Sequence, residues 1–211
     1  MIKKRLLEYS FNFSNGYGKR GASEDYFIKQ IEKFYKCQIF KNPPINCQNI
    51  GFKFYPDIVL YFEKYNIAIA VEIDEPYTLI DGKPIHYYNN VDGIPVFSNE
   101  GVFTPSSENI FTSRTKEITN EGYILIRFAE EQVVLQSEAC CKYIYDNVIR
   151  NLMLKISDTD FSKIQEIKRV KSWTYDEAKR MYSNRYRENY LKKTGNLIDG
   201  DDNSENNDLL F

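Results

Sequence analysis

Two apolar segments within residues 54–77 constrain the fold of this chain more than any other feature of its sequence. They cover residues 58–62 and 66–77, are rich in β-branched and aromatic residues, and flank a polar break at residues 63–66. This pattern is typical of a β-hairpin with a short loop. We therefore expect two neighbouring antiparallel strands around which the rest of the chain is organised.

Three acidic side chains fall at one end of this predicted hairpin. Side chains alternate between the faces of a strand, so Glu72 and Asp74 share one face with Ala68 and Ala70. Asp57 begins the preceding strand, and in an antiparallel pair Asp57 and Glu72 lie at the same end. Concentrated negative charge is costly to bury unless a cation lies close by, and oxygen ligands suit Mg²⁺ or Mn²⁺. The pattern favours a metal site at Asp57, Glu72 and Asp74, and a solvated strand end is the alternative.

The same residues resemble the motif of the PD-(D/E)xK nuclease superfamily, in which Pro-Asp opens one strand and Asp/Glu-x-Lys lies on the next. Here Pro56-Asp57 is followed fifteen positions later by Glu72-Ile73-Asp74. The resemblance covers roughly residues 24–134 and looks closest to the branch related to very-short-patch-repair endonucleases, where Glu-x-Asp replaces Glu-x-Lys and a histidine follows. The departure is Asp74, which stands where the lysine of most members orients the attacking water. Either another residue does this here, or the site is weak or inactive.

The resemblance implies roles for further residues around these acids. Asp57 and Glu72 are implied to hold Mg²⁺ or Mn²⁺, with the Ile73 carbonyl and Asp74 or Glu24 completing the ligand shell. Glu24 matches a glutamate that the superfamily often carries on its first helix, although it could simply complement the helix dipole. His86, the only histidine of the chain, matches the histidine of the branch and is implied to position water or contact phosphate.

Two arginines and a lysine are also candidates. The run that ends in Arg127-Phe128 resembles the third strand of that branch, and Arg114 fits an arginine on the preceding helix. Arg114 or Lys116 could stabilise the reacting phosphate or supply the cation missing at Asp74, and a solvated helix face is the alternative. Because a buried charge is costly when unpaired, we expect Arg127 to pair with a site carboxylate or a helix end.

The distribution of charge is compatible with DNA as the partner. The formal net charge is −2, but five acids and no base lie from residue 199 onward, so the rest of the chain carries +3. The predicted nucleic-acid contacts are Lys19, Arg20, Lys116, Arg127, Arg180 and Arg187. The N-terminal pair could instead belong to a tethered terminus. The C-terminal helix could instead be a solvated helix that packs its tyrosines and Met181 on the body.

The remaining sequence alternates between helical and extended patterns. We expect helices over residues 23–36, 108–121 and 130–153, a strand over residues 123–128, and loops over residues 41–50 and 78–107. Ser23 is a favourable N-cap, Gly122 a favourable helix end, and the third helix breaks near Ser137. Glu75 should point to the face opposite Glu72. The expected fold is an α/β structure with a mixed central β-sheet flanked by helices, a restriction-endonuclease-like core.

The chain divides by composition into three parts. We expect a nuclease core over residues 1–153, a helical basic extension over residues 154–198 with a capping box at Thr174 and Glu177, and a disordered acidic tail over residues 199–211. No apolar run approaches the roughly 20 residues of a membrane span, and no signal peptide pattern is present. The four cysteines match no zinc pattern. These features predict a cytoplasmic protein with reduced thiols and no membrane partner.

The leading hypothesis is a Mg²⁺-dependent endonuclease that hydrolyses DNA phosphodiester bonds, which the resemblance places in a bacterial or mobile-element defence system. One such site cleaves one strand, so cutting both strands would require a homodimer. The rival hypothesis is a catalytically inactive nuclease-like fold that serves as a DNA-binding or assembly module. The missing lysine at Asp74 motivates it.

Overall fold

The two apolar segments form the central hairpin of the molecule in the computed structural model, which describes residues 11, 13–16, 23–47, 51–87, 117–155 and 159–192. Strand β4 (Ile58–Phe62) pairs antiparallel with β5 (Ile67–Asp74), with Ile58 opposite Val71. A 3₁₀ turn at Glu63–Tyr65 joins them and ends at Asn66, whose φ of 49° is tolerated better by asparagine than by most residues. The predicted hairpin is therefore confirmed.

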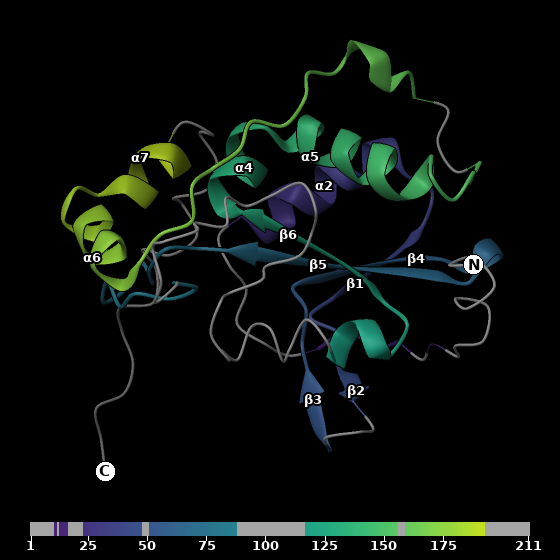
Figure 1. Cartoon of the computed structure of the whole chain (residues 1–211), viewed down its shortest axis with the longest axis horizontal. Helices are drawn as coiled ribbons and strands as arrows, with labels where there is room; N and C mark the ends of the chain where they lie inside the picture. Colours follow the sequence, from purple (N-terminus) through teal and green to yellow (C-terminus); the bar gives the residue numbers. More distant parts are fainter. Residues whose placement is uncertain are drawn as a thin grey trace, which may run out of the picture.

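A mixed four-stranded sheet is built around this hairpin in the order β1-β4-β5-β6. Strand β1 (Gln38–Lys41) pairs antiparallel with β4, and β6 (Ile124–Ala129) pairs parallel with β5. Every residue of β5 is buried, which explains why this strand is apolar on both faces. The structure confirms an α/β fold with a mixed sheet and flanking helices (Figure 1).

One face of the sheet is covered by helices α2 (Glu24–Phe34), α4 (Glu130–Leu135) and α5 (Ser137–Ile144), the last continuing into a π-helical turn at Tyr145–Ile149. The main core lies between these helices and the odd-numbered residues of β5. The expected helix break near Ser137 is confirmed. Ser23 precedes α2 as predicted, but its side chain makes no capping hydrogen bond.

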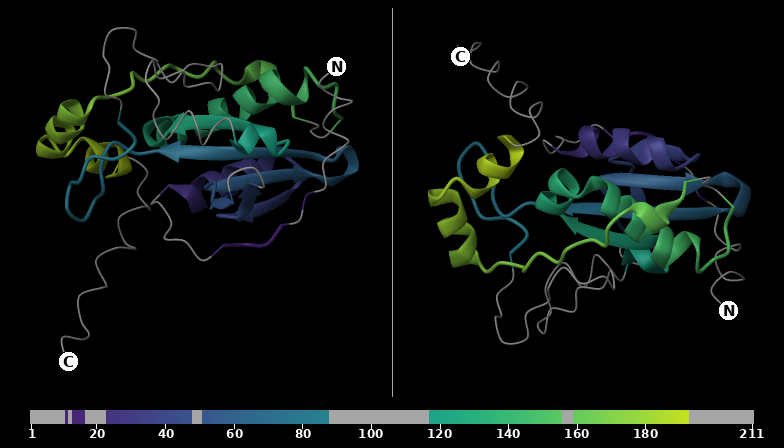
Figure 2. Two further views of the ribbon diagram at one scale, coloured as in Figure 1. Left: turned by 60° about the horizontal axis from the view of Figure 1, so that its bottom comes forward. Right: turned by 90° about the horizontal axis from the view of Figure 1, so that it is seen from above.

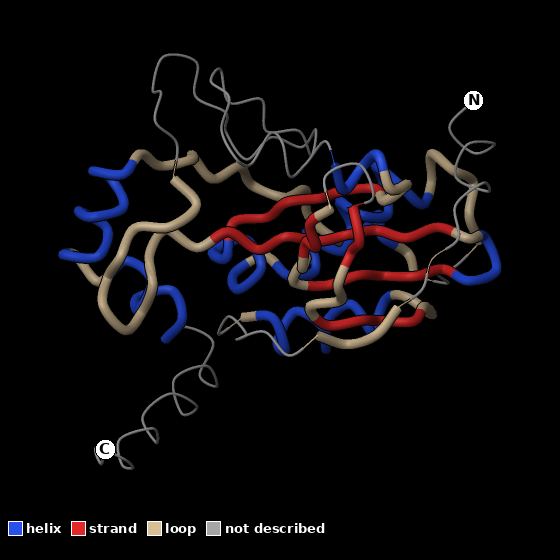
Figure 3. Tube along the Cα trace, turned by 90° about the horizontal axis from the view of Figure 1, so that it is seen from below, coloured by secondary structure: helices blue, strands red, loops and turns tan. Residues whose placement is uncertain are grey.

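The opposite face carries the alternate residues of the same strands. A second cluster is formed by Val59, Ala68, Ala70 and Leu125 of the main sheet. It also includes Ile118, from the helical residues 117–120, and residues of the two-stranded sheet of β2 (Ile45–Cys47) and β3 (Phe52–Phe54). This small sheet lies below the main sheet in Figure 1 and in front of it in Figure 3. The expectation of a loop over residues 41–50 is thus wrong for Ile45–Cys47. Pairing with β3 overrides the turn-forming prolines that precede it.

The C-terminal part forms two short helices, α6 (Tyr175–Ser183) and α7 (Tyr186–Lys192), beyond the end of β5 (Figure 2). The predicted capping box is present, since Thr174 N donates to Glu177 Oε2 at 2.8 Å and Glu177 N donates to Thr174 Oγ1 at 3.2 Å. The single expected helix is interrupted where Arg185 takes a φ of 51°. Within the described ranges, no helix is both long and apolar enough to cross a membrane.

Candidate functional site

Asp57 and Glu72 come together at the end of the central hairpin. The register that pairs Ile58 with Val71 places Asp57, one residue earlier, opposite Glu72 and on the same face. The Ile73 backbone amide donates a hydrogen bond of 2.6 Å to Asp57 Oδ2, which holds this carboxylate against β5. Glu72 is 3% exposed. The prediction that these two acids share one end and one face of the hairpin is confirmed.

Asp57 and Glu72 form a cluster of closely spaced carboxylates at the end of the hairpin, called here the carboxylate corner. Burial raises the pKa of Asp57 well above its usual value, and the neighbouring charge of Glu72 raises it further. Glu24 and Glu75 act in the same direction, while the hydrogen bond from the Ile73 amide opposes them. Glu24 is itself buried at the first residue of α2. Such a carboxyl group holds a proton until a cation takes the proton's place.

Asp74 lies on the same face of β5 but has a different partner. Arg127 Nε donates to Asp74 Oδ2 at 2.9 Å, and its Nη2 donates to Asp74 Oδ1. Both side chains are almost fully buried. The prediction that Arg127 pairs with a site carboxylate is confirmed. Arg127 is buried in this pair, so the expectation that it contacts nucleic acid is corrected, whereas the role of Asp74 as a metal ligand stays a prediction.

The position of Arg127 follows from the parallel pairing of β5 and β6, which places Arg127 opposite Glu72. The cation that neutralises Asp74 thus comes from the neighbouring strand. This pairing could not be seen from the spacing on β5 alone.

His86 reaches the acids at the end of β5. The Glu75 amide donates to His86 Nδ1 at 3.1 Å when the imidazole is neutral, and Glu75 Oε2 lies 3.2 Å from the same nitrogen as its acceptor when the ring is protonated. Asp74 Oδ1 is 3.8 Å away. Burial lowers the pKa of His86, but the carboxylates of Asp74 and Glu75 outweigh burial and raise it to about 9. The imidazole is therefore a cation at neutral pH.

The predicted nucleic-acid contacts divide into three groups. Lys19, Arg20 and Lys116 lie outside the described residues, as does the catalytic candidate Arg114. Arg180 is exposed on α6 and lines a shallow pocket of about 440 Å³ together with Trp173 and Met181.

Arg187 is 4% exposed and binds Glu130 through Nε at 2.5 Å and Nη2 at 2.7 Å. It is therefore a buried structural cation, and the expectation that it contacts nucleic acid is corrected. Sequence reasoning missed this pair. The signal was available, because Arg187 shares a helix face with the buried residues Tyr190 and Leu191 at the i, i+3 and i+4 spacing.

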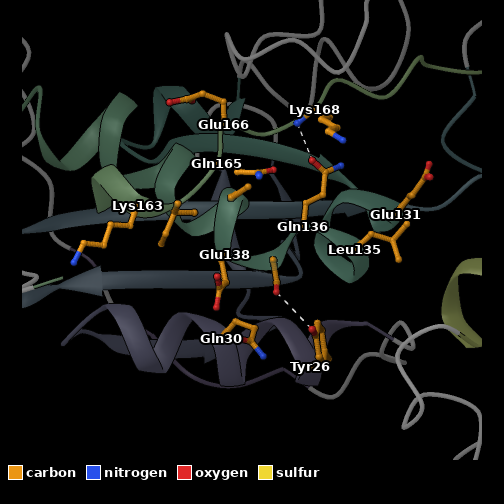
Figure 4. Close-up of a pocket in the computed structure, with 13 residues that line it drawn as sticks. Tyr26, Gln30, Glu131, Leu135, Gln136, Glu138, Lys163, Gln165, Glu166 and Lys168 are labelled. Atoms are coloured by element: carbon orange, nitrogen blue, oxygen red, sulfur yellow. Dashed lines mark hydrogen bonds between the residues drawn. The ribbon is translucent and has the colours of Figure 1, made fainter. Parts of the chain in front are cut away.

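A larger pocket of about 760 Å³ lies on the helical side of the molecule (Figure 4). It is bordered by α2, by α4 and α5, and by residues 163–168, and its lining is mostly polar. The hydroxyl groups of Tyr26 and Ser137, which both line it, are hydrogen-bonded at 3.5 Å, and Gln136 accepts a hydrogen bond of 2.7 Å from the Lys168 amide. Asp57 and Glu72 do not line this pocket. It is a separate feature from the carboxylate corner.

The carboxylate corner offers few protein ligands to a metal ion. Among the described residues, no group of three or more histidine, cysteine, aspartate or glutamate side chains is arranged to hold a metal ion. Mg²⁺ does not need such a group, because it commonly binds one or two carboxylates and takes its other ligands from water and substrate phosphates. Two adjacent carboxylates, one of them with a raised pKa, fit that mode of binding.

Comparisons with protein families, with curated proteins and with solved structures found no match to this chain.

Proposed function

We propose that this protein is a metal-dependent endonuclease that hydrolyses phosphodiester bonds in DNA, with a restriction-endonuclease-like core. The observation that carries the proposal is the placement of Asp57 directly opposite Glu72, on one face and largely out of water. A carboxyl group whose pKa is raised by burial and by a neighbouring carboxylate, as at Asp57, is found at functional sites more often than in purely structural surroundings. The resemblance of Pro56-Asp57 and Glu72-Ile73-Asp74 to the nuclease motif supports the same reaction.

Asp57 and Glu72 would hold Mg²⁺ or Mn²⁺, and the Ile73 amide fixes the orientation of the Asp57 carboxylate. When bound, the ion would supply Lewis-acid polarisation of the phosphoryl group and a bound water of lowered pKa. Because the pKa of Asp57 is raised, protonation of its carboxyl group would compete with metal binding, and the metal would bind more tightly as pH rises. The hydrogen bond from Ile73 remains in either state and keeps the carboxylate oriented toward β5.

Two cations stand beside these acids. Arg127, opposite Glu72 and bound by Asp74, offsets part of the negative charge of the corner. His86 carries a proton at neutral pH because its pKa is about 9, so it acts as a hydrogen-bond donor to a phosphate oxygen rather than as a general base. This assigns phosphate contact, rather than activation of water, to the histidine.

The C-terminal segment supplies the surface for the DNA backbone. Its exposed cations include Lys168, Arg169, Lys171, Lys179, Arg180 and Arg185. Trp173 Nε1 donates to the Ile85 carbonyl at 3.2 Å, so this segment meets the loop that carries His86. A backbone held by these cations would therefore pass close to the carboxylate corner, with a binding constant that falls steeply with salt.

The rival function is a nuclease-like module that binds DNA or organises an assembly without cutting. The observation that favours it is the buried pair of Asp74 with Arg127, which replaces a lysine that could reach the reacting phosphate. Under this alternative the carboxylate corner remains but takes no part in chemistry.

The two functions separate in one experiment. Supercoiled, linear, mismatched and single-stranded DNA are incubated with the protein and Mg²⁺ or Mn²⁺, beside Asp57→Asn, Glu72→Gln and the control Asp25→Asn, which changes an exposed acid of α2. The nuclease predicts cutting by the parent and the control alone, and loss of calorimetric Mn²⁺ binding in the two site variants. Binding of DNA by all four proteins with cutting by none supports the module instead.

A further inference from the structure

Helix α7 is attached to the end of β5 by buried charge. The Arg187 guanidinium binds Glu130 through two nitrogens, and its Nη1 donates to the Tyr77 carbonyl at 2.7 Å. The Arg187 backbone amide donates to the Tyr77 hydroxyl at 2.6 Å, and Tyr190 donates to Glu130 Oε2 at 2.6 Å. Since Tyr77 lies three residues after the end of β5, this cluster fixes the position of α7 relative to the carboxylate corner.

The same guanidinium faces a second carboxylate. Glu75 Oε1 lies 3.6 Å from Arg187 Nη2, whereas its other oxygen, Oε2, lies 3.2 Å from His86 Nδ1. Glu75 is thus held between a buried arginine on one side and the imidazole on the other. A carboxylate placed in this way restricts the orientation of the ring it contacts.

Arg187, Glu75 and His86 alternate in charge, and the series continues from His86 to Asp74 and Arg127. The imidazole lies 3.8 Å from Asp74 Oδ1, and Asp74 is bound by Arg127, which stands opposite Glu72. The side chains along this series are 5%, 13%, 25%, 1% and 1% exposed from Arg187 to Arg127. Interactions between buried charges are screened little by water, so each member strongly favours the observed position of the next.

The backbone beside His86 is also held by the C-terminal segment. His86 adopts a φ of 47°, a conformation that non-glycine residues rarely take. The neighbouring Ile85 carbonyl accepts a hydrogen bond from Trp173, which precedes α6. The loop is therefore fixed through its backbone by Trp173 and through Glu75 by Arg187, and both contacts come from residues 173–187.

We propose that Arg187 is a positioning residue of the candidate site, which acts through Glu75 to hold the imidazole of His86 at the end of β5. The C-terminal segment, beyond offering cations to DNA, then completes the site from a part of the chain more than 100 residues away. The catalytic consequence rests on the proposed nuclease function. The positioning itself does not, and it can be measured in a protein that cuts nothing.

The test uses the fact that the chain has one histidine, so its imidazole protons give a single set of NMR signals. Glu75→Gln removes the linking charge and leaves the pair of Arg187 with Glu130 in place. We expect the His86 signals to move at fixed pH toward those of a solvent-exposed histidine and to broaden. Tyr190→Phe is the matched control, since it removes a hydrogen bond from the same cluster without touching Glu75, and the His86 signals should stay in place.

A second variant removes the contact between Arg187 and Glu75 by changing α7. Arg187→Met alone would leave Glu130 buried beside an apolar side chain, so it is combined with Glu130→Met, which removes both charges together. The double variant should move the His86 signals as Glu75→Gln does. Circular dichroism and a cooperative melting transition establish that each variant is folded before its signals are compared.

The outcomes distinguish this proposal from the nuclease function. If Glu75→Gln and the folded double variant both leave the His86 signals unchanged, the positioning role of Arg187 is overturned, whatever the protein does to DNA. If the signals move and the parent cuts DNA, kcat should fall about ten- to hundredfold in both variants with little change in KM. If the signals move but the parent cuts no DNA, positioning stands and the nuclease function fails.

Discussion

Replacing Asp74 by lysine would give this chain the Glu-x-Lys spacing of the nuclease motif that its sequence resembles, yet we expect Asp74→Lys to damage this protein. Arg127 binds Asp74 through two nitrogens, and each side chain is only 1% exposed. The substitution removes this carboxylate and adds a second cation in the same buried volume. Breaking one partner of a buried pair costs about 3–5 kcal/mol, and we place Asp74→Lys at the upper end of that range.

The measurement is urea unfolding at neutral pH, followed by circular dichroism, with Asp25→Asn as a control at an exposed acid. The exchange variant Asp74→Lys with Arg127→Glu keeps one charge of each sign at the two positions and should recover about half of the loss. A loss below about 1 kcal/mol for Asp74→Lys would mean that the pair contributes as little as a surface ion pair, and would refute the reasoning. Faster DNA cutting by Asp74→Lys than by the parent would equally contradict it.

Three further predictions concern Asp57, Arg180 and Glu130. The pKa of Asp57 is raised in the folded protein, so the stability contributed by its protonated form is full below the ordinary aspartate pKa and is lost as pH rises through the raised pKa. Without metal, Asp57→Asn should therefore unfold at a higher urea concentration than the parent at pH 8 but not at pH 3. Equal urea midpoints at pH 8 would contradict this. Arg180→Ala should weaken DNA binding and lower the slope of log K against log salt by about 1, whereas an unchanged slope in fluorescence anisotropy would remove Arg180 from the interface. Glu130→Ala should cost about 3–5 kcal/mol in urea unfolding because Arg187 loses its main partner, and should cost more than the double change to methionine at both positions; the reverse order would show that the pair is not desolvated.

The sequence predicted the central hairpin well because its information is local. Two apolar runs and a short polar break determine the pairing, and the register then places Asp57 opposite Glu72 without help from any other part of the chain. The third strand and the break near Ser137 were predicted for a similar reason, since glycine and serine interrupt periodic patterns there. The shortest strands, β1, β2 and β3, have three or four residues and carry too little pattern to be recognised.

The partners of the charged residues could not be predicted in the same way. Spacing on β5 shows that Asp74 shares a face with Glu72, but its partner arrives with β6, more than 50 residues later. Arg187 was assigned to DNA because five other cations of the same predicted helix surround it in the sequence, although the three-dimensional structure directs this one inward to Glu130. In each case a long-range contact decides which charge is neutralised, and long-range contacts leave no local periodicity.

The parallel placement of β6 beside β5 has a consequence for how the protein reaches its native state. The hairpin of β4 and β5 joins residues close in the chain, whereas residues 75–123 separate β6 from β5, and contacts between residues close in the chain form faster than distant ones. During refolding, Asp57 and Glu72 would thus meet before Arg127 arrives, and their repulsion would oppose that step. Stopped-flow refolding should therefore speed up with Mg²⁺ in the parent but not in Glu72→Gln, and equal acceleration of both would argue against this order of assembly.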